Sequence, residues 1–233
     1  MSSRTRARSV TYGFAADADV RAEKVRSLGA DGMAFVLAGG GERVAVTIPG
    51  LGRLAVHNAL AGAAVGLAAG LRPPLIAEAL GGGWSAPHRG QLVRAREITI
   101  IDDSYNASPG SVTAALELLA GMPGRRLAVL GEMLELGDGH VAGHRRAGEV
   151  AAGVVDRLVV VGDGAADIAA GARDAGLAPE ATLRTRDRDA ARDLLLGELR
   201  PGDVILVKAS RGVALDVLVD EVVAALGGSG ARA

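Results

Sequence analysis

The pattern of hydrophobic and polar positions changes near residue 90. Before that point it predicts short strands and then two helices, and Pro73-Pro74 separates the helices. The predicted strands lie at residues 10–14, 33–38 and 43–48, and the helices at residues 55–71 and 75–80. The stretch GGGWSAPHRG that follows is rich in glycine and proline, which makes it the best candidate for a domain boundary.

After residue 90, apolar runs alternate with segments of helical spacing. The apolar runs lie at residues 98–101, 127–130, 158–161 and 204–207, and the helical segments at residues 111–119, 141–152, 165–175, 189–199 and 213–226. Strands that alternate with helices indicate βαβ units and a mainly parallel sheet.

The predicted fold class is therefore α/β, with the chain divided into two parts. A Rossmann-like, mainly parallel C-terminal domain is expected at residues 89–228, followed by a disordered tail at residues 229–233. Residues 1–88 form a partial α/β domain in this prediction, because they hold a few strands and two helices without a βαβ unit of their own. We accordingly expect the chain to begin within a domain.

Charge and composition exclude several classes of function. The 26 basic and 27 acidic side chains nearly balance, which gives no electrostatic case for nucleic acid or an anionic membrane. There is no cysteine, so disulfides and thiolate chemistry are excluded, and a reducing, cytoplasmic location is expected. The most apolar segment, residues 54–71, contains His57 and Asn58 and is short for a membrane span of about 20 residues. A buried helix is expected there, not membrane insertion.

Several motifs of known chemistry are missing or incomplete. The sequence holds no G-x-x-x-x-G-K-[ST] phosphate loop and no G-x-S-x-G elbow. Gly162 and Gly164 match two glycines of a dinucleotide fingerprint, but Asp167 replaces the third, so an ordinary βα turn is favoured. His140 and His144 are spaced to share one helical face, yet there is no third ligand, so a solvated or helix-start pair is favoured over a zinc site.

Lysine is rare in this chain, which otherwise uses arginine freely. The only lysines are Lys24 and Lys208. The arginine guanidinium is wide and planar, whereas the lysine ammonium is a compact point charge. A lysine in an arginine-rich chain can therefore indicate a position where an arginine side chain does not fit. For Lys24, chance is the favoured explanation.

Two predicted strands end in polar clusters. The sequence TIIDDSYNASPGSV runs from a strand into paired carboxylates, and VILVKASRG runs from the last strand into a basic turn. In a parallel sheet these strand ends lie at one edge, where ligands bind. Two further polar residues, Asn58 and Arg89, lie near the predicted domain boundary.

The chemistry of these residues suits a nucleotide and an anionic substrate. A strand-end carboxylate can accept hydrogen bonds from a ribose diol, and an amide such as Asn58 can pair with an adenine edge. Arginine suits a phosphate or carboxylate, and a Lys-x-Ser-Arg turn at a helix start suits a substrate carboxylate. Alternatively, Asp102 and Asp103 merely cap and turn the chain, and Ser210 is an N-cap. Each of these structural explanations is reasonable for its own residue, but they explain less well why all of these residues occur together.

Three blocks of sequence resemble the Mur ligases of peptidoglycan synthesis. They are IDDSYNASPGSVTAALELL, GRRLAVLGEMLELGDGHVAGHRRAGEVAA and GDVILVKASRG. The resemblance covers nearly the whole chain: residues 1–88 resemble the second half of the family's central ATP-binding domain, and residues 89–228 its C-terminal domain. It implies an ATP-dependent ligase that forms an amide bond through an acyl phosphate. The D-D-S-Y-N-A-x-P block implies that D-alanyl-D-alanine is added to UDP-N-acetylmuramoyl-tripeptide.

The resemblance also implies roles for individual residues. The nucleotide-binding set is Asn58 on the adenine, Arg89 on the nucleotide, Asp103 (with Asp102 second) on the ribose, and Tyr105 and Asn106 in the same loop. The set that holds the incoming amino-acid or dipeptide substrate is Lys208, Ser210 and Arg211.

Some positions depart from the family pattern. Leu54 replaces a histidine, Ser108 and Gly110 replace Asn and Asp, Ala209 replaces a glycine, and His88 replaces the glycine before Arg89. These mostly small changes are expected to alter the affinity for the ligands more than the assignment of the chain to the family.

The family's phosphate loop, magnesium-binding acids and modified lysine would lie upstream of the residues present. ATP and Mg²⁺ are thus the implied cofactors, with the metal ligands and all catalytic residues expected outside this chain. The chain alone is expected to be inactive, because phosphoryl transfer depends on positioned phosphates and metal. A monomeric state is also expected. Two alternatives stay open: a non-catalytic module that binds a nucleotide or D-amino-acid peptide, and a Mur ligase relative with another amino-acid substrate.

Overall fold

The chain forms two compact units, Met1–Trp84 and Ser85–Ala233. The computed structural model describes residues 7, 9–83, 86–227 and 231–232. The division falls within the GGGWSAPHRG stretch and slightly before residue 88, where the sequence predicted it.

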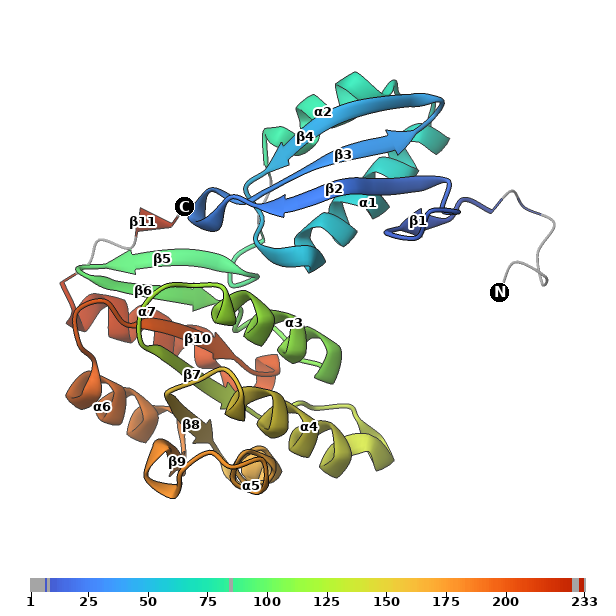
Figure 1. Cartoon of the computed structure of the whole chain (residues 1–233). Helices are drawn as coiled ribbons and strands as arrows, with labels where there is room; N and C mark the ends of the chain where they lie inside the picture. The colour runs from blue at the N-terminus through green and yellow to red at the C-terminus, as the bar shows by residue number, and fades with distance from the viewer. Residues whose placement is uncertain (1–6, 8, 84–85, 228–230, 233) are drawn as a thin grey trace. The chain divides into compact units, whose positions relative to one another are not determined.

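The N-terminal unit is a four-stranded sheet with two helices (Figure 1). Its elements are β1 (Tyr12–Gly13), β2 (Val20–Ser27), β3 (Met33–Gly39), β4 (Glu42–Ile48), α1 (Gly52–Ala68) and α2 (Pro73–Gly81). The strands β2, β3 and β4 are antiparallel, and β1 runs parallel to β2. A tight turn joins β3 to β4 at Gly40 and Gly41, which both have positive φ, as the commonest hairpin turn requires.

Part of this unit departs from the sequence prediction. The first predicted strand shrinks to β1, and β2 was not singled out because VRAEKVRS carries four charges. The helix α1 is half-buried, not buried as predicted: Val56, Leu60 and their neighbours face the core, while Val65 is exposed. No helix in the described part of the chain is long and apolar enough to span a membrane.

The C-terminal unit contains a seven-stranded sheet in the order β11-β5-β6-β10-β7-β8-β9. Its strands are β5 (Gln91–Ala95), β6 (Ile98–Asp102), β7 (Arg126–Gly131), β8 (Arg157–Val161), β9 (Thr182–Thr185), β10 (Val204–Lys208) and β11 (Ala231–Arg232). Five neighbouring strands, in the order β6-β10-β7-β8-β9, are parallel to one another. Strand β5 is antiparallel to β6, and β11 is antiparallel to β5.

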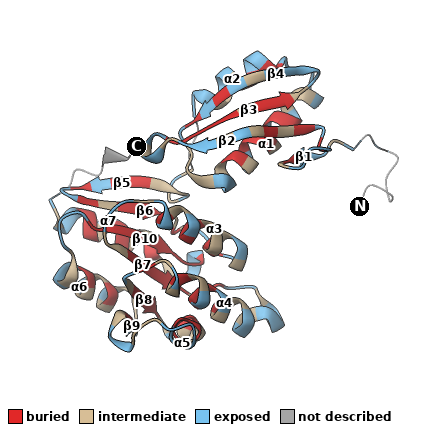
Figure 2. Cartoon of the chain, viewed as in Figure 1, coloured by how far each residue is buried: buried red, intermediate tan, exposed pale blue. Residues whose placement is uncertain are grey.

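Helices cover both faces of this sheet. They are α3 (Pro109–Ala120), α4 (His140–Ala152), α5 (Ala166–Asp174), α6 (Arg188–Glu198) and α7 (Leu215–Ala225). The first three lie on one face and the last two on the other (Figure 1), and the strands between them are almost wholly buried (Figure 2). After β6 and after β7 the chain passes to a helix on one face of the sheet, whereas after β10 it passes to a helix on the other face. The carboxyl end of β10 is therefore a topological switch point, and ligands usually bind at such points in open α/β sheets.

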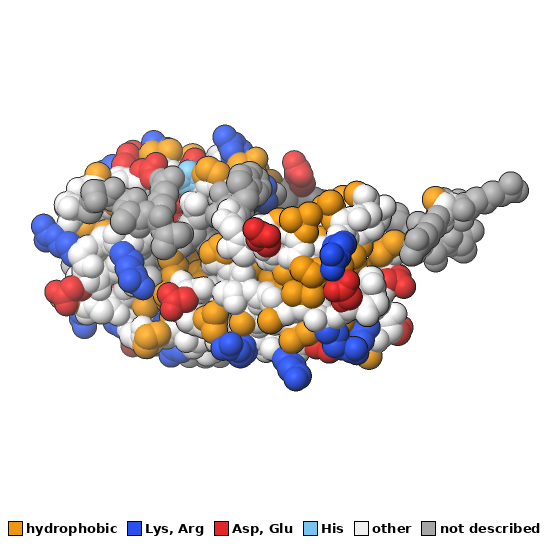
Figure 3. Space-filling model, turned by 90° about the horizontal axis from the view of Figure 1, so that it is seen from above, with side chains coloured by type: hydrophobic (Ala, Val, Ile, Leu, Met, Phe, Trp, Pro, Cys, Tyr) orange, Lys and Arg blue, Asp and Glu red, His pale blue; other side chains and the backbone are white. Residues whose placement is uncertain are grey.

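The predicted α/β fold with a mainly parallel sheet is confirmed. Each predicted strand and helix after residue 90 is present, within a few residues of its predicted bounds. The predicted tail is partly wrong, because Ala231–Arg232 forms β11 and pairs with β5; the rest of that segment lies outside the described residues. On the face drawn in Figure 3, cationic and anionic side chains are interspersed, in keeping with the near-balanced charge.

Candidate functional site

The two strand-end carboxylates point in different directions. Asp102 is fully buried: its Oδ2 lies 2.8 Å from Nδ1 of His88, and its Oδ1 accepts a hydrogen bond of 2.6 Å from the Ser104 hydroxyl. Asp103 lies on the opposite side of the strand, since successive residues alternate, and its side chain is 20% exposed. Asp102 thus has both oxygens occupied, whereas Asp103 keeps surface for a ligand.

Lys208 joins the ends of β6 and β10. Its side chain is only 2% exposed, and its Nζ donates to Oδ2 of Asp103 at 2.5 Å and to the Asn106 carbonyl at 2.8 Å. An ammonium has three donors, so one remains. Burial raises the pKa of Asp103, and the Lys208 charge partly offsets that rise.

Tyr105 gathers two arginines at this edge of the sheet. The Arg89 guanidinium lies 4.1 Å from the ring centroid, and that of Arg211 lies 5.0 Å from it. Both arginines are exposed. Cation–π contacts of this kind hold a guanidinium in place without consuming its N–H donors, so both stay able to bind an anion.

His88 is held in a left-handed conformation, with φ of 60°. This explains the glycine of the family pattern at this position, because glycine adopts positive φ at no steric cost. Three hydrogen bonds hold the histidine: its N–H donates to the Gln91 side chain, its carbonyl accepts from Tyr105 N–H, and its ring pairs with Asp102. They fix the backbone that carries Arg89.

Ser210 links two loops. Its N–H donates to the Glu132 carbonyl at 2.9 Å, and its hydroxyl accepts from the Leu134 N–H at 2.9 Å. Its side chain makes no capping hydrogen bond to the turn that it precedes, so the alternative that it is a simple N-cap is wrong. The turn after β10 is instead bonded to the loop after β7.

His144 corrects another expectation. His140 does begin α4, but His144 is fully buried, not solvated. Its Nε2 accepts from Met133 N–H at 2.9 Å and its Nδ1 donates to the His140 carbonyl at 2.7 Å, which fixes a neutral tautomer. Burial lowers the pKa of His144.

We expect His144 to make the unfolding free energy pH-dependent. Because the pKa of His144 is lowered in the fold, the unfolded chain binds more protons as pH falls through the usual histidine range, so stability is lost on acidification. Urea unfolding at pH 7.5 and pH 5.5 measures this loss. The variant His144→Gln should lose less on acidification than the wild type, and an unchanged loss would contradict the assignment.

The glycines of the partial fingerprint have a structural explanation. Gly162 has φ of 85°, and a Cβ on Gly164 would lie 2.2 Å from Oε2 of Glu132. The positive φ of Gly162 suits a glycine in the turn after β8, and Gly164 leaves room for the Glu132 carboxylate, which fits an ordinary βα turn. No group of three His, Cys, Asp or Glu side chains in the described residues could hold a metal ion, so these residues do not fit a magnesium site.

Asn58 belongs to the N-terminal unit, where its side chain is exposed on α1. The other predicted site residues all lie in the C-terminal unit. They gather at the ends of β6 and β10 and in the segment before β5, namely Arg89, Asp102, Asp103, Tyr105, Asn106, Lys208, Ser210 and Arg211.

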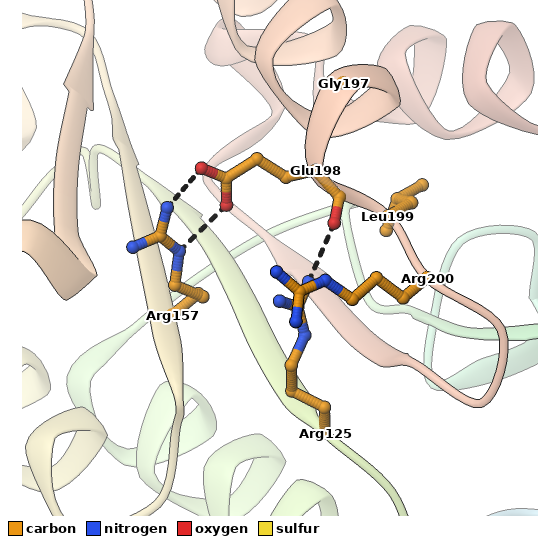
Figure 4. A pocket seen from close by; sticks show the side chains of 6 residues that line it. All are labelled: Arg125, Arg157, Gly197, Glu198, Leu199 and Arg200. Atoms are coloured by element: carbon orange, nitrogen blue, oxygen red, sulfur yellow. Dashed lines mark hydrogen bonds and ion pairs between the residues drawn. The ribbon is translucent and has the colours of Figure 1, made fainter.

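A depression of about 490 Å³ lies at the opposite, amino-terminal edge of the sheet (Figure 4). Arg157 forms a two-pronged ion pair with Glu198 there, and Arg125 donates to the Glu198 carbonyl and pairs with the buried Asp203. Sequence reasoning did not single out these residues. The arginines tie the end of α6 to the starts of β7 and β8, which is a structural role.

Comparison with known proteins now identifies the family. The family described as "Mur ligase, glutamate ligase domain" matches residues 88–211, more than half of the chain. The chain belongs to the Mur ligase family. The match includes every predicted site residue except Asn58, and it confirms the resemblance seen in the sequence.

Individual Mur ligases show the same relationship. The UDP-N-acetylmuramoyl-tripeptide–D-alanyl-D-alanine ligase of Mycobacterium leprae is 43% identical in an alignment 187 positions long, which covers 72% of this chain and 36% of that protein. A crystal structure of MurF from Acinetobacter baumannii gives a TM-score of 0.80 at 25% identity, covering 92% of this chain and 46% of that one.

The fold is also shared with the MurF ligase of Thermotoga maritima, whose structure was determined in complex with ADP. Its TM-score is 0.76 at 22% identity, covering 91% of this chain and 48% of that one. This chain therefore spans little more than a third of the Mycobacterium leprae ligase and about half of the two solved structures.

Proposed function

We propose that the chain is the C-terminal part of an ATP-dependent Mur ligase that adds D-alanyl-D-alanine to UDP-N-acetylmuramoyl-tripeptide. The observation that carries the proposal is the cluster of Lys208, Asp103, Tyr105, Arg89 and Arg211 at the switch point of the sheet. The 43% identity to a ligase of this name supports it. The proposal includes ATP and Mg²⁺ as cofactors, a monomeric state and a cytoplasmic location.

The nucleotide part of the proposal rests on Asp103 and Arg89. Asp103 is the better ribose acceptor of the two acids, because both oxygens of Asp102 are already engaged. Arg89 lies on Tyr105 with its donors available for a phosphate. Bound ATP would supply the phosphoryl group that activates the acceptor carboxylate.

The dipeptide part rests on Arg211 and Lys208. The exposed Arg211 guanidinium can bind a carboxylate in bidentate fashion. Lys208, which is paired with Asp103, has one donor left for the same ligand. We infer that this turn takes the carboxylate of D-alanyl-D-alanine, while Ser210 holds the turn against the loop after β7.

Calorimetric titration of the chain with ADP and with D-alanyl-D-alanine tests both parts. Removing the charge in Asp103→Asn is expected to weaken ADP binding by roughly tenfold or more, because hydrogen bonds to a charged group are worth about 1.5–3 kcal/mol. Asp163→Asn, at a carboxylate that is fully exposed, is the matched control and should not change it. A wild-type chain that binds neither ligand would refute the proposal.

The two alternatives are separated by further measurements. If L-alanine or D-glutamate bound more tightly than D-alanyl-D-alanine, a different amino-acid substrate would be favoured. Because the sequence holds no phosphate loop, the chain alone should bind its ligands without forming an amide bond. Ligation by this chain with ATP and Mg²⁺ would contradict that expectation. If the chain binds these ligands but a longer protein that includes it does not form the amide bond, the non-catalytic module would be favoured.

A further inference from the structure

The carboxylate of Glu132 is fixed in place directly after β7. Its Oε1 lies 3.1 Å from Nε2 of His140, and the turn at Gly164 passes so close that a Cβ there would lie 2.2 Å from its Oε2. Its side chain is nevertheless 32% exposed. A carboxylate that is held from two sides and open on a third is suited to receive a cation.

Glu132 also lies beside the turn proposed to hold the dipeptide carboxylate. Its carbonyl accepts the N–H of Ser210 at 2.9 Å, and the strands that carry the two segments, β7 and β10, are neighbours. Adjacent strands are about 4.8 Å apart, and a dipeptide in extended form spans roughly 7 Å. An extended dipeptide is thus long enough to cross from the backbone of the turn after β10 to that of the loop after β7.

Three other carboxylates at this edge of the sheet already have side-chain partners. Asp103 pairs with Lys208, Asp102 with His88 and Ser104, and the exposed Asp163 pairs with Arg184. Glu132 is paired with an imidazole and with no lysine or arginine in the described part of the chain. Its negative charge is therefore not offset by a cationic side chain and can be offered to a ligand.

We propose that Glu132 is the subsite for the amino-terminal ammonium of the incoming dipeptide, with His140 and Gly164 as the residues that position its carboxylate. A dipeptide is a zwitterion, and the edge offers a negative group at Glu132 and a positive group at Arg211. The inference rests on the proposed function, because it takes the turn after β10 as the site of the other end. It adds a group on the protein that would recognise the free amine during binding.

Titration of the chain by NMR with D-alanyl-D-alanine and with N-acetyl-D-alanyl-D-alanine tests this inference. The acetyl group removes the ammonium and leaves the carboxylate. The wild type should bind the free amine about tenfold more tightly than the acetylated form, as expected for a charge-assisted hydrogen bond. In Glu132→Gln this preference should fall to about twofold or less, and binding of the acetylated form should be unchanged.

Two further variants make the test specific. Gly164→Ala should reduce the same preference, because the new Cβ displaces the carboxylate without removing it. Glu149→Gln removes an equal charge from the exposed face of α4, where Glu149 pairs with Arg146, and should leave the preference intact. An unchanged NMR fingerprint outside the loop shows that each variant is folded.

The possible results are distinct. If Glu132→Gln weakens both dipeptides equally, or weakens neither, the inference is overturned while the proposed function stands. If the wild type binds neither dipeptide, the proposed function fails, and the inference fails with it. Loss of the preference in Glu132→Gln and in Gly164→Ala, with Glu149→Gln unaffected, supports the ammonium subsite.

Discussion

Replacing Gly148 by alanine is expected to destabilise the C-terminal unit by about 3 kcal/mol or more, enough to unfold a marginally stable domain. A Cβ at this position would lie 1.9 Å from the Ile168 carbonyl oxygen and 2.7 Å from the Ala172 nitrogen. Both are backbone atoms of α5, so no side chain can rotate away. Gly171 of α5 shows the reciprocal contact, since its Cβ would lie 2.1 Å from the Arg145 carbonyl oxygen of α4.

The two helices therefore touch backbone to backbone, and relief would require them to separate. That separation would open the layer over β7 and β8 and expose core residues such as Ala147 and Ile168. The cost includes the strain of the methyl group as well as the packing lost around it.

Urea or guanidinium unfolding measures the effect, with Gly197→Ala as the matched control. Gly197 also lies in a helix, α6, but nothing lies within 4 Å of a Cβ added there. Alanine should be neutral or stabilising by about 0.5–1 kcal/mol at that position, because it lowers the entropy of the unfolded chain. Equal stability of the two variants would show that α4 and α5 are not packed as described.

The contact between Gly148 and α5 illustrates what the sequence leaves undetermined. The apolar runs such as Leu127–Leu130 predicted their strands because a parallel strand buried on both faces must be apolar throughout. Gly148, in contrast, lies in an ordinary helical pattern, and its role arises from the distance to another helix. Short strands such as β9, with only four residues and a central arginine, also lack a pattern strong enough to predict.

The candidate site shows the same division. The sequence pointed to Asp102, Asp103 and Lys208 because ligands bind at the carboxyl ends of parallel strands and because lysine is rare in this chain. It ranked Asp103 before Asp102 only by resemblance, and the structure supplies the physical reason for that order in the partners of Asp102. Glu132 was missed as a site residue, although it lies in a quoted block, because its surroundings come from the separate segments at His140, Gly164 and Ser210.

Replacing Lys208 by methionine is expected to cost about 2–4 kcal/mol at pH 7 and to abolish binding at the site. Methionine fills a similar volume but leaves the Asp103 carboxylate and the Asn106 carbonyl without their donor. Breaking a buried ion pair costs roughly 3–5 kcal/mol, and the partial exposure of Asp103 reduces that figure. Arginine should also fail, because its wide fork does not fit a side-chain site that is 2% exposed.

The stability lost in Lys208→Met should partly return on acidification. Burial raises the pKa of Asp103, and without the lysine only the weaker backbone hydrogen bond from Gly90 offsets that rise. Between the usual aspartate pKa and this raised value, the folded variant binds more protons than the unfolded chain, so its stability increases as pH falls. Unfolding measured at pH 7 and pH 5 should therefore show a smaller difference from the wild type at pH 5.

Two controls separate the loss of the ion pair from the loss of any lysine. Lys24→Met, at the other lysine of the chain, removes an exposed charge and should change stability by less than about 0.5 kcal/mol. The double variant Asp103→Asn/Lys208→Met should be more stable than Lys208→Met alone, because the unpaired carboxylate is gone. If instead the two substitutions simply add, Lys208 and Asp103 do not depend on each other, and Lys208 would be free to act on a ligand without first holding the loop after β6.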